Sequence, residues 1–509
     1  MKKNIFLTTA LAISLVSFSS CEDFLTEDNP NKIPVENYFS SENDVERAVN
    51  GAYTALRSGS CMGEGSTMYT EERSDNMGRI DNQSSSGEPF QFTDFSLLPS
   101  NTYLKTHWTA MYKTVTNCNF AIKGANTIQF EKEADKLNYI AEAKFVRALA
   151  YFDIVRKWGD APLVTDYLTT PTEVTAQTVR VEKAKVYEQI VQDLKDGLDS
   201  TLPNHQPEGS KGHANKAAIS GLLGKVYLTM AAALESNKAE YLNNAKTYLT
   251  QCYNMKSFGE LKDIPYEDVF DVSKKSTCSE ILFQIVYIQG DIEYSSSIAK
   301  NNQPGGITDL SLAKTSGRGN FVNADVANEY EEGDLRKTWS VAYVDNSSAK
   351  GWYVSKYRDT SEAAGTLGYG GNNWTILRYA DVILMLAEVN EALGQEEEAI
   401  SFLNQVRDRA GLPNYQTMQA DADYTAKYPT LKLAILHERR SELAFENQRW
   451  YDLLRFFSID ELITYMHNKN QDDYGISNLK NFGKKDIYYP IPYDEWKLNP
   501  EQMYQNEGY

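Results

Sequence analysis

Cysteine is scarce in this 509-residue chain, which has only five, and no two of them form a CxxC pair. So few thiols in a chain of this length exclude a disulfide-dense scaffold and the cysteine-pair zinc motifs. One cysteine lies near the start of the chain and is discussed below. We interpret the other four as ordinary thiols in or near the core, and the sequence cannot say whether any are paired: they are Cys61, Cys118, Cys252 and Cys278.

Positive charge is also in short supply. The chain has 51 Lys and Arg residues against 70 Asp and Glu residues, so its formal net charge is −19. Proteins that bind nucleic acids neutralise phosphates with basic patches. The charge balance therefore argues against a nucleic-acid partner.

No apolar run reaches the roughly 20 residues that a membrane-spanning helix needs. The longest early run, Ile5 to Phe18, follows two lysines and ends at small serines. A basic start, a short apolar stretch and small residues are typical of a secretory signal peptide. We therefore expect residues 1–20 to be a signal peptide rather than a membrane anchor.

Cys21 follows the sequence Phe18-Ser19-Ser20, which matches a bacterial lipobox in its small residues and its cysteine. This pattern predicts a lipidated Cys21, and acyl chains would then hold the protein on a bilayer. The alternative is a plain signal peptide followed by an incidental cysteine. Residues 21–35 are acidic and contain two prolines, so we expect an extended tether there.

Catalytic motifs are missing as well. The stretch "GLLGKVY" fails the phosphate-loop pattern, and "HERRSELAF" fails the zinc-protease pattern at Ser441. The five histidines are dispersed and no GxSxG nucleophile motif occurs. Carboxylates are too numerous to exclude a glycosidase pair by count, but Glu438, Glu442 and Glu446 recur every four residues beside arginines, which predicts a helical ion-pair ladder. We expect no enzymatic activity.

What the chain does contain is helical periodicity. Apolar residues recur at helical spacing in "SENDVERAVNGAYTAL", "EAKFVRALAYFDIVRKWG", "LLGKVYLTMAAAL", "RYADVILMLAEVNEALG" and "AISFLNQVRDRAGL". Paired amphipathic helices of this kind resemble tetratricopeptide hairpins. Long segments at 58–104 and 256–373 interrupt them, with short strands expected at 279–287 and 351–358. The sequence therefore predicts a mostly α fold with long irregular loops.

Polar and aromatic residues gather in these two irregular segments. Flat aromatic faces and planar hydrogen-bonding groups are what sugar recognition requires, and loops on a rigid scaffold often carry binding sites. We therefore predict ligand contacts from both segments, whereas Trp108 lies in a helical pattern and is expected in the core. The predicted ligand residues are Tyr69, Arg73, Asp75 and Asn76 from the first segment, and Tyr294, Trp352, Tyr369, Asn372 and Trp374 from the second.

These helical stretches, together with "CEDFL" after the lipobox, "ERRSELAFENQRWYDLLRF" and "YYPIPYDEWKLNPEQMYQNEGY", resemble the SusD/RagB family of nutrient-binding lipoproteins of Bacteroidetes. The resemblance implies four tetratricopeptide-like helix pairs with ligand loops packed against them. It also implies an outer-membrane, surface-exposed protein that passes oligosaccharides to a TonB-dependent SusC-like transporter and caps it as a lid. It implies no catalysis.

The resemblance further implies one SusD-like domain over residues 36–509, with an N-terminal part to about residue 255 and a C-terminal part from about residue 256. Three alternatives remain: a peptide ligand, a protein-binding tetratricopeptide adaptor, and a lipid-anchored hydrolase. We expect no cofactor. A structural calcium ion bound by an Asp-rich loop is one further alternative, although no EF-hand spacing is present.

Overall fold

The computed structural model describes residues 38–78, 87–234, 236–291, 293–302, 312, 321–345, 350–470 and 479–509. Eight long helices dominate it, and they pack as four consecutive pairs, as the resemblance implied. The pairs are α3 (Glu42–Leu56) with α5 (Thr102–Thr127), α6 (Glu133–Trp158) with α8 (Lys183–Leu198), α9 (Lys216–Ala233) with α10 (Lys238–Asn254), and α15 (Tyr379–Ala392) with α16 (Glu396–Arg409).

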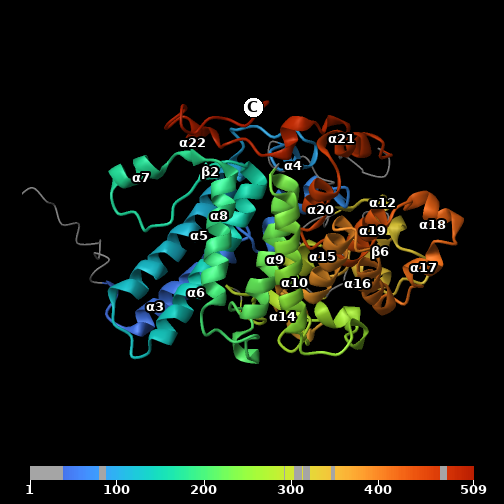
Figure 1. The fold of residues 1–509 in the computed structure, drawn as a ribbon, viewed down its shortest axis with the longest axis horizontal. Helices are drawn as coiled ribbons and strands as arrows, with labels where there is room; N and C mark the ends of the chain where they lie inside the picture. Colours follow the sequence, from blue (N-terminus) through green and yellow to red (C-terminus); the bar gives the residue numbers. More distant parts are fainter. Residues whose placement is uncertain are drawn as a thin grey trace, which may run out of the picture.

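Neighbouring pairs also contact each other, so the four pairs form one continuous array. Figure 1 shows this array running from α3 and α5 through α9 and α10 to α15 and α16. Helix α19 (Leu431–Leu443) packs against both α15 and α16 and closes the far end of the array. The array is the rigid frame to which the loops attach.

Local sequence explains several of these helices. Helix α3 has Ser41 as its N-cap, and Ser41 forms a capping box with Asp44 that stabilises the start of the helix. In the "GLLGKVY" stretch, a Cβ on Gly224 would lie 2.5 Å from Leu249 Cγ, so this glycine allows α9 and α10 to approach closely. The adjacent Lys225 is helical and pairs with Asp381 at 2.8 Å, which confirms that this stretch is no phosphate loop.

Further short elements connect the long helices. The α-helices are α4 (Phe90–Thr93), α7 (Pro171–Gln177), α11 (Ile298–Asn301), α12 (Ala324–Glu329), α13 (Lys337–Ser340), α14 (Glu362–Leu367), α17 (Tyr415–Met418), α18 (Ala422–Lys427), α20 (Arg449–Phe456), α21 (Ile459–His467) and α22 (Tyr493–Trp496). The 3₁₀ turns are η2 (Glu64–Tyr69), η3 (Glu71–Arg73), η4 (Glu208–Ser210), η5 (Leu261–Asp263), η6 (Tyr266–Val269), η8 (Leu479–Asn481) and η9 (Lys484–Ile487).

The strands form three small antiparallel sheets within the described residues. One sheet has the order β1-β5-β7-β6, and the other two pair β2 with β3 and β4 with β8. Strands β4 and β7 lie where the sequence predicted them, although β7 ends at residue 354. The strands are β1 (Met77–Gly78), β2 (Ala161–Pro162), β3 (Arg180–Val181), β4 (Ile281–Ile285), β5 (Phe321–Val322), β6 (Val341–Val344), β7 (Gly351–Val354) and β8 (Trp374–Arg378).

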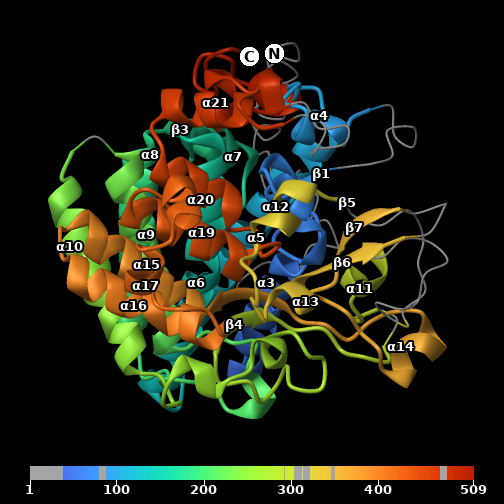
Figure 2. The same cartoon turned by 90° about the vertical axis from the view of Figure 1, so that its right-hand side faces the viewer.

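The irregular elements collect on one side of the helical array. Figure 2 shows β5, β6 and β7 with α11 and α14 on the side opposite α10 and α16. The large apolar core includes residues from both halves of the chain, for example Phe145 of α6 and Phe283 of β4, whose rings meet edge to face at 4.9 Å. The side bearing these strands is called the loop face below.

Two expectations about the core are confirmed. Trp108 is buried, with 4% of its surface exposed. The four cysteines beyond the start of the chain are free thiols, and all four are buried. Burial raises the pKa of the Cys61 thiol to about 12, which leaves it protonated and unreactive at neutral pH.

The expected helical ion-pair ladder at Glu438, Glu442 and Glu446 is wrong. Helix α19 ends at Leu443, so Glu446 lies outside it, and all three carboxylates are buried. They pair with cations from distant segments, because a buried carboxylate needs a counter-charge wherever the fold brings one. Arg378 at the end of β8, for instance, bonds Glu442 at 2.6 Å and Glu446 at 2.8 Å.

Candidate functional site

Two stretches of the loop face are tied to each other by backbone and carboxylate hydrogen bonds. Ser296 and Gly370 form an antiparallel bridge, with N–H to O distances of 2.9 and 2.8 Å. The Glu64 carboxylate accepts from the N–H groups of Ser297 at 2.7 Å and Ile298 at 3.1 Å. The Asn373 side-chain oxygen accepts from Tyr287 N–H at 2.9 Å. These bonds fix the loops in place on the helical frame.

A pocket of about 450 Å³ opens beside these loops, between the end of α3, the segment 208–213 and the end of β4. Its lining mixes apolar residues, such as Phe283 and Ile285, with polar ones, such as Asn50 and Gln284. The acidic and basic residues that line it are Arg57, Glu208, Lys211, His213 and Lys275. A pocket of this size and mixed lining is the usual form of a small-molecule site.

Hydrogen bonds order one wall of the pocket. His213 Nδ1 lies 2.6 Å from the Glu142 carboxylate, which also accepts from the Tyr53 hydroxyl at 2.8 Å. The hydrogen bond to Glu142 raises the pKa of His213 above its ordinary value. The Tyr53 oxygen in turn accepts from Ala214 N–H at 2.9 Å, so this wall is held rigidly.

Three of the sequence-predicted residues are half-buried aromatics on the loop face. Tyr294 and Tyr369 come from the two stretches that the Ser296–Gly370 bridge joins. The Arg57 guanidinium lies 4.5 Å from the centre of the Tyr294 ring, which places Tyr294 next to the pocket. The Lys300 ammonium lies 4.2 Å from the centre of the Tyr369 ring.

The third aromatic, Trp352, lies on the β6–β7 hairpin. It is paired with Tyr343 across the two strands, and their rings meet edge to face at 5.2 Å. Val341 and Val354 form a buried pair two residues along on the same face, which anchors the Tyr343–Trp352 pair to the core. Sequence reasoning missed Tyr343, although the alternation of "VAYV" before "GWYV" is a hairpin signal that could have found it.

The first predicted set lies in the interior rather than on the surface: Tyr69, Arg73, Asp75 and Asn76 are each at most 3% exposed. The Asp75 carboxylate receives two hydrogen bonds from Arg449, at 2.7 and 2.9 Å, and the Asn76 oxygen accepts from Arg440 Nε at 2.9 Å. Arg73 lies among three aromatic rings, and Tyr69 stacks on His107 at 4.1 Å. These groups contact the protein itself and offer no surface to a ligand.

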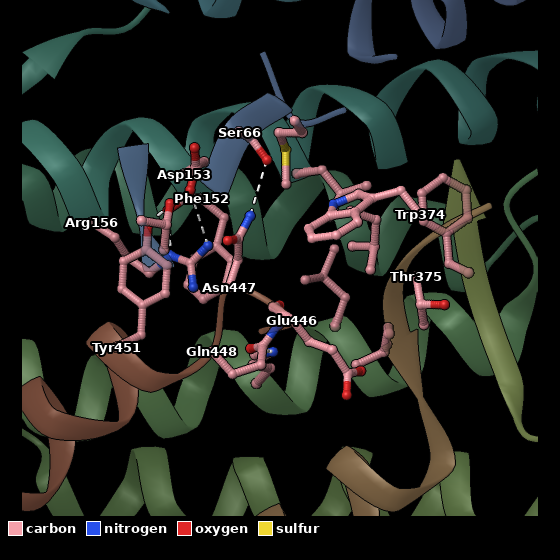
Figure 3. Close-up of a pocket in the computed structure, with 18 of the residues that line it drawn as sticks. Ser66, Phe152, Asp153, Arg156, Trp374, Thr375, Glu446, Asn447, Gln448 and Tyr451 are labelled. Carbon is pink, nitrogen blue, oxygen red and sulfur yellow. Dashed lines mark hydrogen bonds and ion pairs between the residues drawn. The ribbon is translucent and has the colours of Figure 1, made fainter. Parts of the chain in front are cut away.

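Two residues of the second set are also buried. Asn372 is 2% exposed and donates to the Arg358 carbonyl oxygen at 3.2 Å. Trp374 is 1% exposed, and Figure 3 shows it on the wall of an internal cavity with Asn447 and Tyr451. That cavity measures about 50 Å³. It has room for roughly one or two water molecules, which is too little for a sugar ring.

Other expectations concern anchoring and metals. The predicted lipidation site, Cys21, lies outside the described residues. Across the part of the chain that the structure describes, no helix is long and apolar enough to cross a membrane. In those same residues no group of three or more His, Cys, Asp or Glu side chains could hold a metal ion.

Glu71 lies in the buried segment beside Arg73, and its burial shifts its pKa in a way that can be tested. Its side chain is 0% exposed, and one oxygen accepts from Asn76 Nδ2 at 2.9 Å and Phe445 N–H at 3.0 Å. The other oxygen has no hydrogen-bond partner among the residues that the structure describes. Burial raises the pKa of Glu71 from 4.5 to about 7, despite these bonds.

The pKa of Glu71 is higher in the folded protein than its ordinary value of 4.5. Its contribution to the free energy of unfolding is therefore fully present below pH 4.5 and is lost as the pH rises through about 7. We therefore expect the free energy of unfolding of Glu71→Gln, relative to that of the wild type, to rise by about 3 kcal/mol between pH 4.5 and pH 8. This follows because each pKa unit corresponds to about 1.36 kcal/mol. Urea unfolding of both proteins at the two pH values measures the change. A constant difference between them would show that Glu71 titrates normally.

The array of helix pairs with a loop-built pocket places this chain in the class of tetratricopeptide-like scaffold proteins. Two family models match its sequence: one described as "SusD family" over residues 280–509, and one described as "Starch-binding associating with outer membrane" over residues 23–228. The chain belongs to the SusD/RagB family, as its sequence motifs indicated.

Individual proteins agree with this assignment. SusD-like protein P2 of Formosa agariphila is 27% identical over 100% of both chains. Surface glycan-binding protein A of Bacteroides fluxus has a TM-score of 0.75 at 20% identity, covering 92% of this chain and 100% of its own. Surface glycan-binding protein A of Bacteroides thetaiotaomicron, in complex with laminarihexaose, has a TM-score of 0.74 at 18% identity and the same coverage. At these identities the structural likeness shows the fold.

Proposed function

We propose that this protein captures oligosaccharides on the loop face and delivers them to a TonB-dependent SusC-like transporter, which it covers as a lid. The observation that carries the proposal is the set of half-buried aromatics on the loop face: Tyr294, Trp352 and Tyr369. Tyr294 contacts Arg57, which lines the 450 Å³ pocket. Such rings present flat faces to a sugar, and the fixed loops hold them with little loss of entropy on binding. The protein acts as a binding protein and catalyses no reaction.

Family membership supports the same proposal. Two structures with this fold are named as surface glycan-binding proteins, and one of them holds laminarihexaose. Attachment through a lipid on Cys21, at the outer face of the outer membrane, completes the proposal. It would keep the loop face close to a transporter in the same membrane.

Binding to a panel of polysaccharides and oligosaccharides, measured by calorimetry on the soluble protein without its first 21 residues, tests this function. We expect Trp352→Ala and Tyr294→Ala each to weaken glycan binding at least about tenfold, because a central aromatic contact is typically worth more than 1 kcal/mol. Tyr493→Ala on α22 is the matched control, since Tyr493 is an exposed tyrosine away from the loop face.

Two outcomes would contradict the proposal in different ways. If glycans bind and both loop-face variants bind them as the wild type does, the ligand site lies elsewhere. If no glycan binds while peptides do, the ligand class is a peptide, which is the alternative for this family.

A further inference from the structure

The pocket beside Tyr294 is positively charged in a strongly acidic protein. The chain carries a formal net charge of −19, yet the pocket is lined by Arg57, Lys211 and Lys275 against a single carboxylate, Glu208. The nearby Glu142 is hydrogen-bonded to His213 and Tyr53 in the pocket wall. The sign of charge in the pocket is thus opposite to that of the whole molecule.

None of these cations has a carboxylate partner in the pocket. Among the ion pairs of the described residues, none involves Arg57, Lys211 or Lys275, although all three side chains are half-buried. Lys275 instead donates to the carbonyl oxygens of Tyr287 at 2.7 Å and Gly371 at 2.6 Å. These bonds fix its position. Burial lowers the pKa of Lys275, and the charge of Asp359 acts in the opposite direction.

This arrangement differs from that of two fully buried arginines in the ion-pair network of the core. Arg336 and Arg378 are surrounded by carboxylates at 2.6 to 3.1 Å. Holding a cation in a partly desolvated position without a counter-charge costs free energy. An anionic group that entered the pocket would recover that cost, and it would form stronger hydrogen bonds than a neutral hydroxyl.

Arg57 lies between the positively charged pocket and the proposed sugar-binding residue Tyr294. Its guanidinium lies 4.5 Å from the centre of the Tyr294 ring and lines the pocket as well. A sugar that stacks near Tyr294 would therefore hold its substituents next to a cation. A carboxylate or sulfate ester on the ring meets this geometry, since Arg pairs with both groups through planar, two-point hydrogen bonds.

We infer that this pocket selects glycans that carry negative charge, through a carboxylate or sulfate group received by Arg57 and Lys211. The inference rests on the proposed glycan-binding function and names its ligand class. Two chemical sources of the charge exist, uronic acids and sulfated sugars, and the experiment distinguishes them.

The test is calorimetry with two matched pairs of probes. One pair is an oligogalacturonate and its methyl ester, and the other is a sulfated galactan oligosaccharide and its desulfated form. We expect the charged member of one pair to bind at least about tenfold more tightly than its neutral partner. Arg57→Gln and Lys211→Gln should each remove most of that preference while leaving thermal unfolding unchanged.

Lys185→Gln is the matched control, because Lys185 is an exposed lysine on α8, away from the pocket. Equal binding of charged and neutral probes would overturn the charge selection while glycan binding itself stands. A charge preference that survives both pocket variants would overturn the assignment to this pocket. Failure of every probe and of the wider glycan panel would instead remove the proposed function on which the inference rests.

Discussion

Arg378→Met is expected to lower the free energy of unfolding by about 3–5 kcal/mol. Arg378 is 1% exposed and bonds three carboxylates, at 2.7 Å to Glu280, 2.6 Å to Glu442 and 2.8 Å to Glu446. Methionine preserves the apolar stem and removes the charge. The three buried carboxylates would then share fewer counter-charges, and water could not replace the lost one.

The carboxylates would keep some compensation, because Arg409 also pairs with Glu280 and Glu442, and Lys356 pairs with Glu446 at 2.8 Å. Urea unfolding at pH 7 measures the loss. Lys185→Met is the control, since Lys185 forms an exposed pair with Glu188 and should cost less than about 1 kcal/mol. A loss below that value for Arg378→Met would mean that the network adapts and adds little stability.

Trp374→Ala is expected to destabilise the protein by about 3–5 kcal/mol, the usual cost of truncating a buried tryptophan. Trp374 begins β8, lies opposite Ile285 in the β4–β8 pair, and contacts the Tyr357 ring at 5.2 Å. Removing the indole would enlarge the 50 Å³ cavity that it lines (Figure 3). Thermal and urea unfolding measure this loss.

Trp352→Ala provides the comparison within the same protein. Trp352 is half-buried on a strand at the loop face, so its loss should cost less stability than that of Trp374 while weakening glycan binding. If Trp374→Ala stayed as stable as the wild type and lost glycan binding, the prediction from sequence that Trp374 contacts the ligand would hold after all.

The long helices could be predicted from sequence because helix formation depends on local patterns. Apolar spacing and the capping box at Ser41 both lie within a few residues of the elements they define. Several of the family motifs fall in these same helices, and so they indicated the array of pairs. For the same reason "GLLGKVY" could be placed inside a helix without any structure.

The ligand residues were less predictable, because irregular segments carry no periodicity that separates inside from outside. Asp75 and Asn76 stand in a polar, glycine-rich stretch that looks like a surface loop. Their partners, Arg440 and Arg449, lie more than 360 residues later in the chain. The pocket has the same property, since Arg57, Lys211 and Lys275 come from three distant segments.

The sequence by itself determined the helices, the order of their pairs and the family. The tertiary structure decided which loop residues are buried: Tyr69, Arg73, Asn372 and Trp374 lie inside, whereas Tyr294, Trp352 and Tyr369 remain partly exposed. The physical reason is that a helix is set by contacts between near neighbours in the chain. The burial of a loop residue and its charge partners depend instead on segments that meet only once the whole chain has folded.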